Sequence, residues 1–531
     1  MSRPNPSTLP KTGIDGLKEN WRHDLPSGFL VFLIALPLCL GISVASGFPP
    51  SAGIITVIIG GILVSHLSGS YLTINGPAAG LIVVVLAAVQ ALGEGDALAG
   101  YRYTLAAIVV ASVLQIVMGR YQLGRLSAFF PASVVHGMLA AIGLIIIATQ
   151  SHVMLGVTPS PGRLLSIIAQ LPHSLLNMNT QTVLISFLGF EVLMIWPLIN
   201  TKIPAPLIVV LVGMVFAWHF GLHEKSITDG TNYLVAIPDN FLSSFAFPDF
   251  SKITTIAFWE AVLSISLVGS LESLLSATAV DKLDPYKRTS NLDRDLTAIG
   301  LGNLLCGLIG GLPMIAEIVR SSANISHGAK TAWANCFHGL LLLLFIVLFP
   351  KLIQAIPLAS LATLLVYTGY KLASPNAFAR VKHIGKEQLL MFLVTIIGVL
   401  AIDLLAGVAL GIIAKLVINL LRGVWPRNLF KIHFTIEQQG KDTLVIKLLG
   451  SALFSNFLPL KQALSRQEHG KKIIFDFTEG YLIDHTVMEF INDFKLNYEA
   501  QGGQCQTLGQ VLETFSDHSL AARLMSADDR K

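Results

Sequence analysis

Long apolar runs follow one another along most of the chain, separated by short polar stretches or by stretches rich in Gly and Pro. Many of these runs reach the roughly 17 to 25 residues that an α-helix needs to cross a bilayer. The runs cover residues 29–47, 51–68, 78–93, 104–118, 132–149, 182–199, 205–221, 256–280, 296–310, 334–349, 358–373, 388–402 and 404–421. With a short interrupted segment at 313–327, they predict an α-helical polytopic membrane protein with 14 transmembrane segments.

The composition supports this interpretation and narrows the range of partners. Of the 531 residues, 53% are hydrophobic and 13% are charged, which is typical of an integral membrane protein. The net charge of +4 does not indicate a nucleic-acid partner, because Lys and Arg in membrane proteins mostly set topology. The four cysteines lack a metal-binding spacing, and no catalytic motif is present. We therefore expect no enzyme activity, no metal and no cofactor other than a coupling ion.

Basic residues gather in alternate connections between the apolar runs. After the eighth and twelfth segments these residues are Lys282, Lys287, Arg288, Arg294, Arg380, Lys382 and Lys386. The opposite connections carry Glu94, Asp96, Asp239 and Asp249 instead. Because basic loops stay on the cytoplasmic side, the pattern predicts an inner or plasma membrane protein with both termini in the cytoplasm.

Two Gly- and Pro-containing breaks occupy matching places in the two halves of the chain. One reads "INGPAAGLIVV" around Pro77, and the other reads "GGLPMIAEIVR" around Pro313. Seven segments in each half is an odd number, so the repeat must be inverted across the membrane, as in many transporters. Gly76 and Gly311 would let the backbone turn, and each proline would suit the first turn of a half-helix. Two helix N-termini facing one point would form a cradle for an anion.

The pattern changes after about residue 430. The stretches "TLVIKLLG", "KKIIFDF" and "QCQTLG" are typical of short strands, and apolar residues between 487 and 498 repeat at helical spacing. Strands alternating with helices predict a small α/β domain. We therefore divide the chain into an N-terminal cytoplasmic segment (1–24), a transmembrane transport domain (25–425) and a cytoplasmic α/β domain (430–531).

Several stretches carry a family resemblance when they are taken together: "NGPAAG", "LVGSLESLLSATAVD", "GLGNLLCGLIGGLP", "EIVRSSANISHGAKT" and "IIFDFTEGYLIDHTVMEFI". In this combination the chain resembles the SulP family of anion transporters with a C-terminal STAS domain. The resemblance implies a seven-plus-seven inverted repeat with two broken half-helices, a gate domain and elevator-like motion. It also implies a homodimer, and a regulatory partner of unknown kind at the STAS domain.

The expected site residues come from the breaks and from one membrane carboxylate. The expected substrate-binding residues are Gly76, Pro77, Ala78, Ala79, Ile315, Ala316, Glu317 and Arg320. Glu272 lies within an apolar run, where an ionised carboxylate costs at least about 2.5 kcal/mol, so a functional role is the default. It matches the family position linked to the coupling cation, with Ser276 one turn later. Sodium-using relatives tend to carry Asp there, so sodium and protons both stay open.

Two features bear on the charge and polarity of the expected site. Glu317 and Arg320 either neutralise each other as an i, i+3 pair, or Glu317 binds a proton while Arg320 supplies positive potential. In many sulfate-type relatives Pro37 would be followed by Gln, whereas here Leu38 and Cys39 follow it. This less polar version is similar to bicarbonate-type members and weakens the case for sulfate.

The expected function is secondary active transport of a small inorganic anion across a lipid bilayer, with bicarbonate slightly ahead of sulfate. Coupling to a sodium or proton gradient is expected because of Glu272. An uncoupled chloride/bicarbonate exchanger or channel of the same family is the first alternative. A nucleobase permease of the same fold is the second, and the STAS domain and Arg320 disfavour it.

Overall fold

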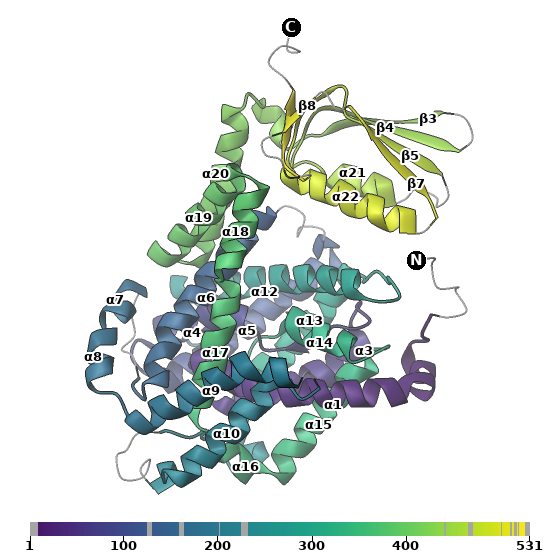
Figure 1. Cartoon of the computed structure of the whole chain (residues 1–531). Helices are drawn as coiled ribbons and strands as arrows, with labels where there is room; N and C mark the ends of the chain where they lie inside the picture. Colours follow the sequence, from purple (N-terminus) through teal and green to yellow (C-terminus); the bar gives the residue numbers. More distant parts are fainter. Residues whose placement is uncertain are drawn as a thin grey trace. The chain divides into compact units, whose positions relative to one another are not determined.

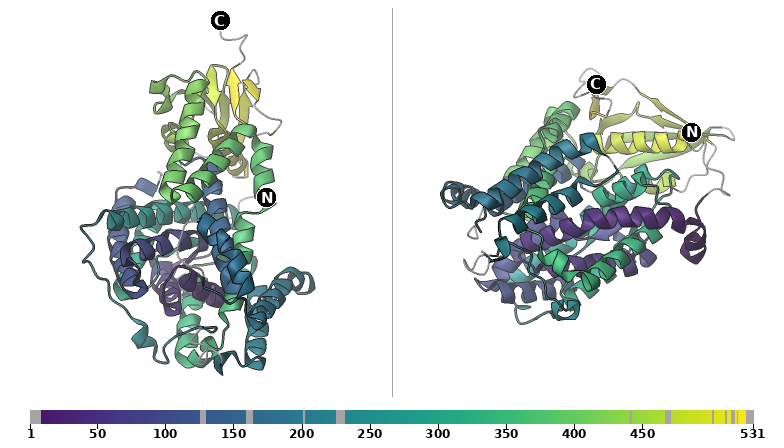
Figure 2. Two further views of the ribbon diagram at one scale, coloured as in Figure 1. Left: turned by 90° about the vertical axis from the view of Figure 1, so that its left-hand side faces the viewer. Right: turned by 60° about the horizontal axis from the view of Figure 1, so that its bottom comes forward.

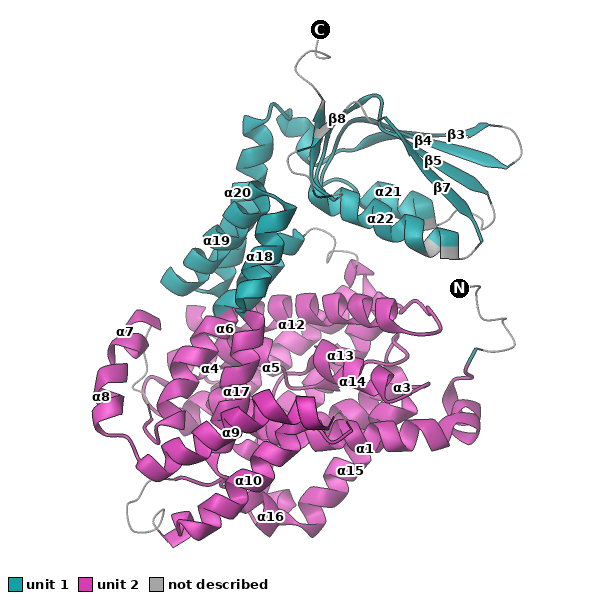
Figure 3. Cartoon of the chain, in the orientation of Figure 1, with its two compact units in different colours: residues 1–9, 125–141, 373–531 teal, residues 10–124, 142–372 magenta. Residues whose placement is uncertain are grey.

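The computed structural model describes residues 9–124, 130–158, 164–200, 202–224, 232–439, 442–465, 471–500, 502–509, 512–514, 518 and 520–525. Parts of all three predicted regions, including residues 1–8, lie outside the described residues. The chain is mostly helical with a C-terminal α/β region, which confirms the predicted fold class. It forms two compact units (Figure 3): residues 10–124 and 142–372, and residues 1–9, 125–141 and 373–531. The predicted domain boundaries stay a prediction.

The unit of residues 10–124 and 142–372 contains most of the predicted membrane segments. Its longer helices, some shared with the other unit at one end, are α1 (Gly13–Ala45), α2 (Pro50–Ile59), α4 (Ile82–Gly93), α5 (Ala97–Arg120), α6 (Ala132–Met154), α9 (Thr180–Ile199), α10 (Ala205–His219), α12 (Ile256–Leu283), α13 (Leu292–Ile309), α14 (Ile318–Ser326), α15 (Trp333–Leu348) and α17 (Leu358–Leu372). Shorter helices are α3 (Ser65–Leu67), α7 (Leu164–Ala169), α8 (Leu171–Leu176) and α16 (Pro350–Gln354), with a π-helical turn η2 (Gly60–Val64) and 3-10 turns η3 (Ala79–Leu81) and η5 (Phe241–Ser244).

Seven helices in the described part of the chain are long and apolar enough to cross a membrane: Gly13–Ala45, Pro50–Leu67, Ala97–Arg120, Ala132–Met154, Thr180–Ile199, Ile256–Leu283 and Leu404–Leu421. Four shorter apolar helices, Ala79–Gly93, Leu164–Leu176, Ala205–His219 and Trp333–Leu348, accompany them. These helices support an integral membrane protein. The count of 14 segments and the inverted repeat stay predictions.

Small residues let the membrane helices approach one another closely. A Cβ atom added to Gly28 of α1 would lie 2.5 Å from the carbonyl oxygen of Ala334, at the start of α15. Gly61 in η2 and Gly339 in α15 face each other in the same way. Figure 2 shows α1 as a long purple helix with the green α15 beside it. Close approach of this kind is how helices associate in lipid, where the hydrophobic effect does not drive packing.

The other unit carries the C-terminal α/β region together with helices α18 (Pro375–Ile384), α19 (Lys386–Ala401) and α20 (Leu404–Leu421). A 3-10 turn η6 (Pro426–Leu429) leads into strands β3 (His433–Gln439), β4 (Thr443–Ala452), β5 (Lys472–Asp476), β6 (Gly480–Ile483), β7 (Gln504–Leu508), β8 (Leu512–Thr514) and β9 (Arg523–Met525). Helices α21 (Leu458–Ser465) and α22 (His485–Ala500) lie side by side against the sheet (Figure 1).

The sheet of this region is mixed. Its strand order is β7-β5-β4-β6-β9-β8, and β3 pairs with β4 as well. The β4, β5, β6 and β7 pairs are parallel, whereas β3 and β9 run antiparallel to their neighbours. The three strands predicted from sequence are β4, β5 and β7. The predicted helical repeat between 487 and 498 lies in α22, whose apolar face packs on these strands. A STAS domain fits this sheet.

Asp484 directly precedes α22 and caps its N-terminus, so its substitution should loosen the first turn of this helix. Its buried carboxylate accepts hydrogen bonds from the amides of Phe454 (2.7 Å) and Val487 (3.0 Å), and burial raises its pKa above the ordinary value. Asp484→Ala should cost about 0.5–2 kcal/mol, the usual value of an N-cap. Hydrogen exchange of the α22 amides in the full chain should rise accordingly. Thr486→Ala, which changes a half-buried neighbour in the same turn, should change exchange little; equal effects would contradict the cap.

Candidate functional site

The two predicted breaks meet in a short antiparallel ribbon. Strand β1 (Ile74–Gly76) pairs with β2 (Ile315–Glu317), so that Ile74 lies opposite Glu317 and Gly76 opposite Ile315. Two stretches that lie far apart in the sequence therefore form one structure. The prediction that the breaks lie close together is confirmed.

The helices after the breaks begin later than predicted. The turn η3 starts at Ala79 and α14 starts at Ile318, so neither Pro77 nor Pro313 occupies a first helical turn. That detail of the prediction was wrong. The reason is that backbone groups which would otherwise be unsatisfied in a membrane bond across the ribbon, which favours an extended backbone.

Buried polar side chains hold the break that contains Pro313. The Thr56 hydroxyl on α2 donates to the carbonyl of Leu312 at 2.9 Å. The Asn303 side chain on α13 bonds to both backbone groups of Met314. Its oxygen accepts from the Met314 amide at 2.6 Å, and its nitrogen donates to the Met314 carbonyl at 3.2 Å. These bonds satisfy backbone groups that neither a helix nor the ribbon uses.

Helix α14 holds the break that contains Pro77 in a similar way. Ser321 Oγ accepts from the Ile74 amide at 2.8 Å, and Asn324 Nδ2 donates to the Leu72 carbonyl at 3.1 Å. Ser321 and Asn324 are spaced i, i+3 and share one helix face. None of these four side chains, Thr56, Asn303, Ser321 and Asn324, was predicted. In the sequence such a residue can be recognised as a single polar residue within an apolar run, as Asn303 is in "GLGNLLCGL".

Arg320 is fully buried between the two breaks. Its Nη2 donates to the carbonyl of Pro77 at 3.0 Å, so the side chain reaches from one break to the other. Within the described residues its Nη1 has no hydrogen-bond partner. This nitrogen lies where Gly76 has no side chain, because a Cβ atom there would be 2.6 Å from it. A buried cationic donor with free capacity is what an anion site needs.

Glu317 pairs with Arg320, as one of the two predicted alternatives requires. Glu317 Oε2 lies 2.9 Å from Arg320 Nε, although the direction does not suit a hydrogen bond. Glu317 is only half-buried, whereas Arg320 is inaccessible to solvent. The pair lowers the positive potential of the site without using Nη1 or Nη2.

Glu272 lies against the turn that follows the first break. The residue is 7% exposed, and within the described residues its Oε1 has no hydrogen-bond partner. A Cβ atom on Gly80 would overlap the carboxylate, so glycine is required for this close approach. Helix α12 also packs against β2, and the Glu317 carboxylate acts on Glu272 as a like charge. Glu272 is therefore near both breaks and partly unsatisfied.

The remaining predicted residues lie in the same place. Ala78, Ile315 and Ala316 are buried beside the ribbon, and Ala79 is half-buried at the start of η3. Ser276 is half-buried one turn beyond Glu272 on α12. The structure thus brings the predicted substrate residues together around the ribbon, with Glu272 next to them; their roles in binding stay predictions.

Comparison with known proteins identifies the family of the chain. Residues 21–395 match the sulfate permease family, which is the SulP family. The chain belongs to this family. The predicted family, and with it the class of membrane transporter, is confirmed.

Two relatives and one solved structure illustrate the match. YvdB of Bacillus subtilis (strain 168), provisionally named a sulfate transporter, is 28% identical over 406 residues, covering 75% of this chain and 73% of YvdB. The bicarbonate transporter BicA of Picosynechococcus is 27% identical over 409 residues, covering 76% and 71%. The murine anion transporter Slc26a9, solved in the inward-facing state, has a TM-score of 0.67 with 16% identity, covering 94% and 87%. This last likeness extends the shared fold into the C-terminal domain.

A single methyl group should disable the site of this sulfate permease family member at Gly80. In Gly80→Ala the new Cβ would displace the Glu272 carboxylate or the η3 turn. Because overpacking in a tight site typically costs about 1–3 kcal/mol, we expect uptake to fall at least about fivefold. Uptake per folded transporter measures this. Gly41→Ala in α1, where the added Cβ would make ordinary contacts at 3.4 Å, should be nearly silent; similar losses in both variants would contradict a special role of Gly80.

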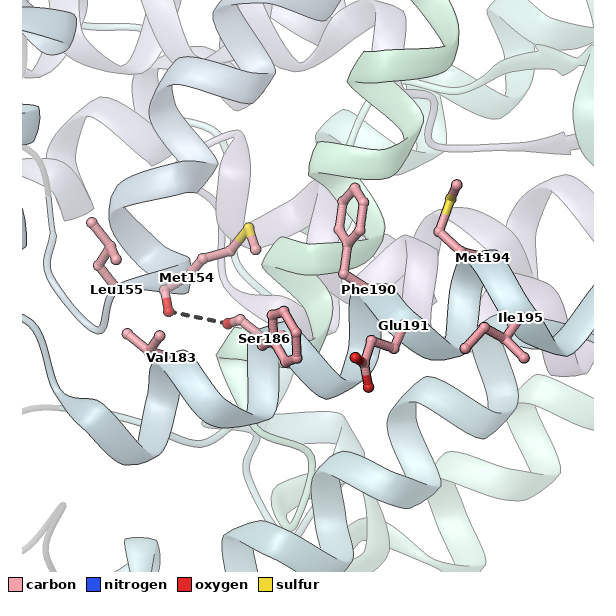
Figure 4. A pocket seen from close by; sticks show the side chains of 9 residues that line it. Met154, Leu155, Val183, Ser186, Phe190, Glu191, Met194 and Ile195 are labelled. Atoms are coloured by element: carbon pink, nitrogen blue, oxygen red, sulfur yellow. Dashed lines mark hydrogen bonds between the residues drawn. The ribbon is translucent and has the colours of Figure 1, made fainter.

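A cavity of about 370 Å³ lies away from the ribbon, between the end of α6 and α9 (Figure 4). It is lined mainly by apolar side chains, and the Ser186 hydroxyl beside it donates to the carbonyl of Met154 at 3.0 Å. Glu191 is its charged lining residue and is exposed on α9. The cavity includes neither break, so it is separate from the predicted site residues.

Proposed function

We propose that the protein is a secondary active transporter of a small inorganic anion, coupled to sodium ions or protons. The observation that carries this proposal is the position of Arg320. Its guanidinium is fully buried, bonds to the carbonyl of Pro77 and has an Nη1 without a partner in the described residues. An anion bound there would satisfy a donor that otherwise costs about 1–3 kcal/mol or more to bury.

The charges around the ribbon support coupling to a cation. Arg320 is the cation of this group, and Glu317 and Glu272 are its two carboxylates. With both carboxylates ionised, this group has a net negative charge and repels an anion. A sodium ion or proton on Glu272 would remove that excess. Cation binding would then favour anion binding at the neighbouring donor, which is the requirement for symport.

The choice of anion rests on polarity. The residues beside Arg320 include Met314, Ile315 and Ala316, which offer no side-chain donors, and Glu317 already pairs with the guanidinium. A doubly charged ion has a larger desolvation penalty than a singly charged one. This favours bicarbonate over sulfate. The similarity to BicA is in accord with bicarbonate, and the similarity to YvdB keeps sulfate as the second candidate.

The remaining parts of the proposal come from the family. Movement would be elevator-like, with alternating access of the ribbon to the two sides of the membrane. The protein would form a homodimer with cytoplasmic termini, and its STAS domain would receive a regulatory partner. Native mass measurement in lipid nanodiscs tests the assembly: a predominant dimer is expected, and a monomer at working concentration would contradict it.

The transport proposal is tested with purified protein in liposomes. Uptake of radiolabelled bicarbonate and sulfate should be measured under an inward sodium gradient, an inward proton gradient, and neither. Sulfate serves the proton arm, because changing pH converts bicarbonate to carbon dioxide, which crosses bilayers unaided. We expect accumulation of at least one anion under one gradient. Accumulation under neither gradient, with exchange intact, would indicate the uncoupled exchanger instead.

A further inference from the structure

Helix α12, which carries Glu272, is joined to the second break by a chain of buried side-chain amides. We propose that Ser270, Gln115 and Asn303 are positioning residues that transmit the state of Glu272 to β2. The inference rests on the proposed coupled transport and assigns the coupling path to specific hydrogen bonds. None of the three residues is predicted to bind the anion or the cation.

The chain of bonds is continuous from helix to ribbon. Gln115 Nε2 on α5 donates to Ser270 Oγ on α12 at 3.3 Å. Asn303 Nδ2 on α13 donates to Gln115 Oε1 at 2.8 Å. The same Asn303 amide also holds the backbone of Met314, directly before β2: its Oδ1 accepts from the Met314 amide, and its Nδ2 donates to the Met314 carbonyl as well. Each amide therefore uses both its oxygen and its nitrogen within the chain.

The surroundings of these residues strengthen the connection. Ser270, Gln115 and Asn303 are all buried, and hydrogen bonds in such low-dielectric surroundings are stronger than in water. A Cβ atom on Gly269 would lie 3.2 Å from Gln115 Nε2, so the glycine lets α12 approach α5 closely. A buried chain of hydrogen bonds leaves little freedom for Ser270 at one end to shift without Asn303 at the other.

Helix α12 consequently touches the two breaks by two different routes. Glu272 lies directly against Gly80 after the first break, and Ser270, two residues earlier, is bonded through Gln115 and Asn303 to the second. Loading Glu272 with a cation removes its repulsion by Glu317 and changes the force on α12. Since helices move as rigid elements, that change is carried to Met314 and the ribbon.

The test uses two variants that break the α12 end of the chain and leave the Asn303 bonds to Met314 intact. Ser270→Ala removes the acceptor, and Gln115→Met removes the amide with a side chain of similar length. The matched controls are Ser266→Ala in α12 and Thr104→Val in α5. Both remove buried hydroxyls that, within the described residues, bond to a carbonyl of their own helix and to no other group. Full-length protein in liposomes is used throughout.

Gradient-driven accumulation should fall about five- to tenfold in both relay variants, at the lower end of known coupling strengths. Anion exchange without a gradient should stay within about twofold of the wild type, because the anion site is unchanged. Both controls should behave as the wild type. A relay variant that accumulates normally, or one that loses exchange and accumulation in parallel, would overturn the relay, since the second result indicates a purely structural role.

A second readout separates failure of the relay from failure of the proposed function. Hydrogen exchange of residues 310–326 is measured with and without sodium, and at two pH values. We expect one of these changes to alter exchange in the wild type and not in Gln115→Met. That result supports the relay even if wild-type liposomes accumulate no anion, which would count against coupled transport alone. No response in the wild type would overturn the relay.

Discussion

Replacing Glu272 with Gln should sharply reduce gradient-driven accumulation while downhill anion exchange continues. Gln keeps the shape and the hydrogen-bonding capacity beside Gly80 but removes the charge that would bind a cation. Without that charge the site no longer depends on the cation, so accumulation should drop at least about fivefold, the lower bound of typical coupling effects. The measurement is labelled anion uptake into liposomes, normalised to transporter content.

The control for this substitution is Glu260→Gln on the same helix. Glu260 is exposed at the beginning of α12, so losing its charge should leave uptake unchanged. Undiminished accumulation by Glu272→Gln would refute the role of Glu272 and leave Glu317 as the next candidate. Equal losses in both variants would point to a general effect of charge on α12.

The wild-type protein distinguishes the two coupling ions. If Glu272 binds sodium, sulfate uptake should rise with external sodium and be nearly indifferent to a pH gradient. If it binds a proton, the reverse should hold. If neither ion stimulates uptake, Glu272 does not bind a coupling ion, and the uncoupled exchanger would then be favoured.

Removing the charge of Arg320 should have the second largest effect, this time on anion binding. Hydrogen bonds to charged groups contribute about 1.5–3 kcal/mol, so affinity should fall roughly 10- to 150-fold. Arg320→Gln alone would also leave the half-buried Glu317 carboxylate without its cationic partner, which destabilises the fold. The double variant Arg320→Gln with Glu317→Gln avoids that penalty and keeps the ribbon neutral.

Comparison of the single and double variants separates binding from folding. The double variant should unfold at nearly the wild-type temperature yet bind sulfate and bicarbonate weakly. Arg320→Lys should fall in between, because an ammonium group keeps the charge but lacks the planar fork that spans the two breaks. Wild-type affinity in the double variant would exclude Arg320 as the anion donor.

The positions of the longest apolar helices were predictable from apolar runs alone. The run at 132–149 lies inside α6 and the run at 256–280 lies inside α12, because lipid-facing and buried helix surfaces are both apolar. The breaks were predictable as well, since Gly76, Pro77, Gly311 and Pro313 interrupt that pattern in matching places. Likewise Glu272 and Arg320 are conspicuous as charges inside apolar segments.

The pairing of the two breaks was not predictable from local pattern. Strands β1 and β2 have three residues each, contain Gly and polar residues, and are stabilised by partners distant in the sequence. Because the local pattern does not reveal the pairing, it places Pro77 and Pro313 in first helical turns, which the fixed φ of proline suits. Gln115 and Asn303 take part in contacts between α5, α12 and α13. Residue spacing within one helix cannot predict such contacts.

The most direct test of the account measures the affinity of the wild-type protein for sulfate and bicarbonate at low and at saturating concentrations of the coupling ion. A shared, net negative site predicts that the cation tightens anion binding, and that the anion tightens cation binding by the same factor. Glu272→Gln should bind the anion with an affinity that the cation does not change. Anion affinity in the wild type that is indifferent to sodium and, for sulfate, to pH would contradict the account.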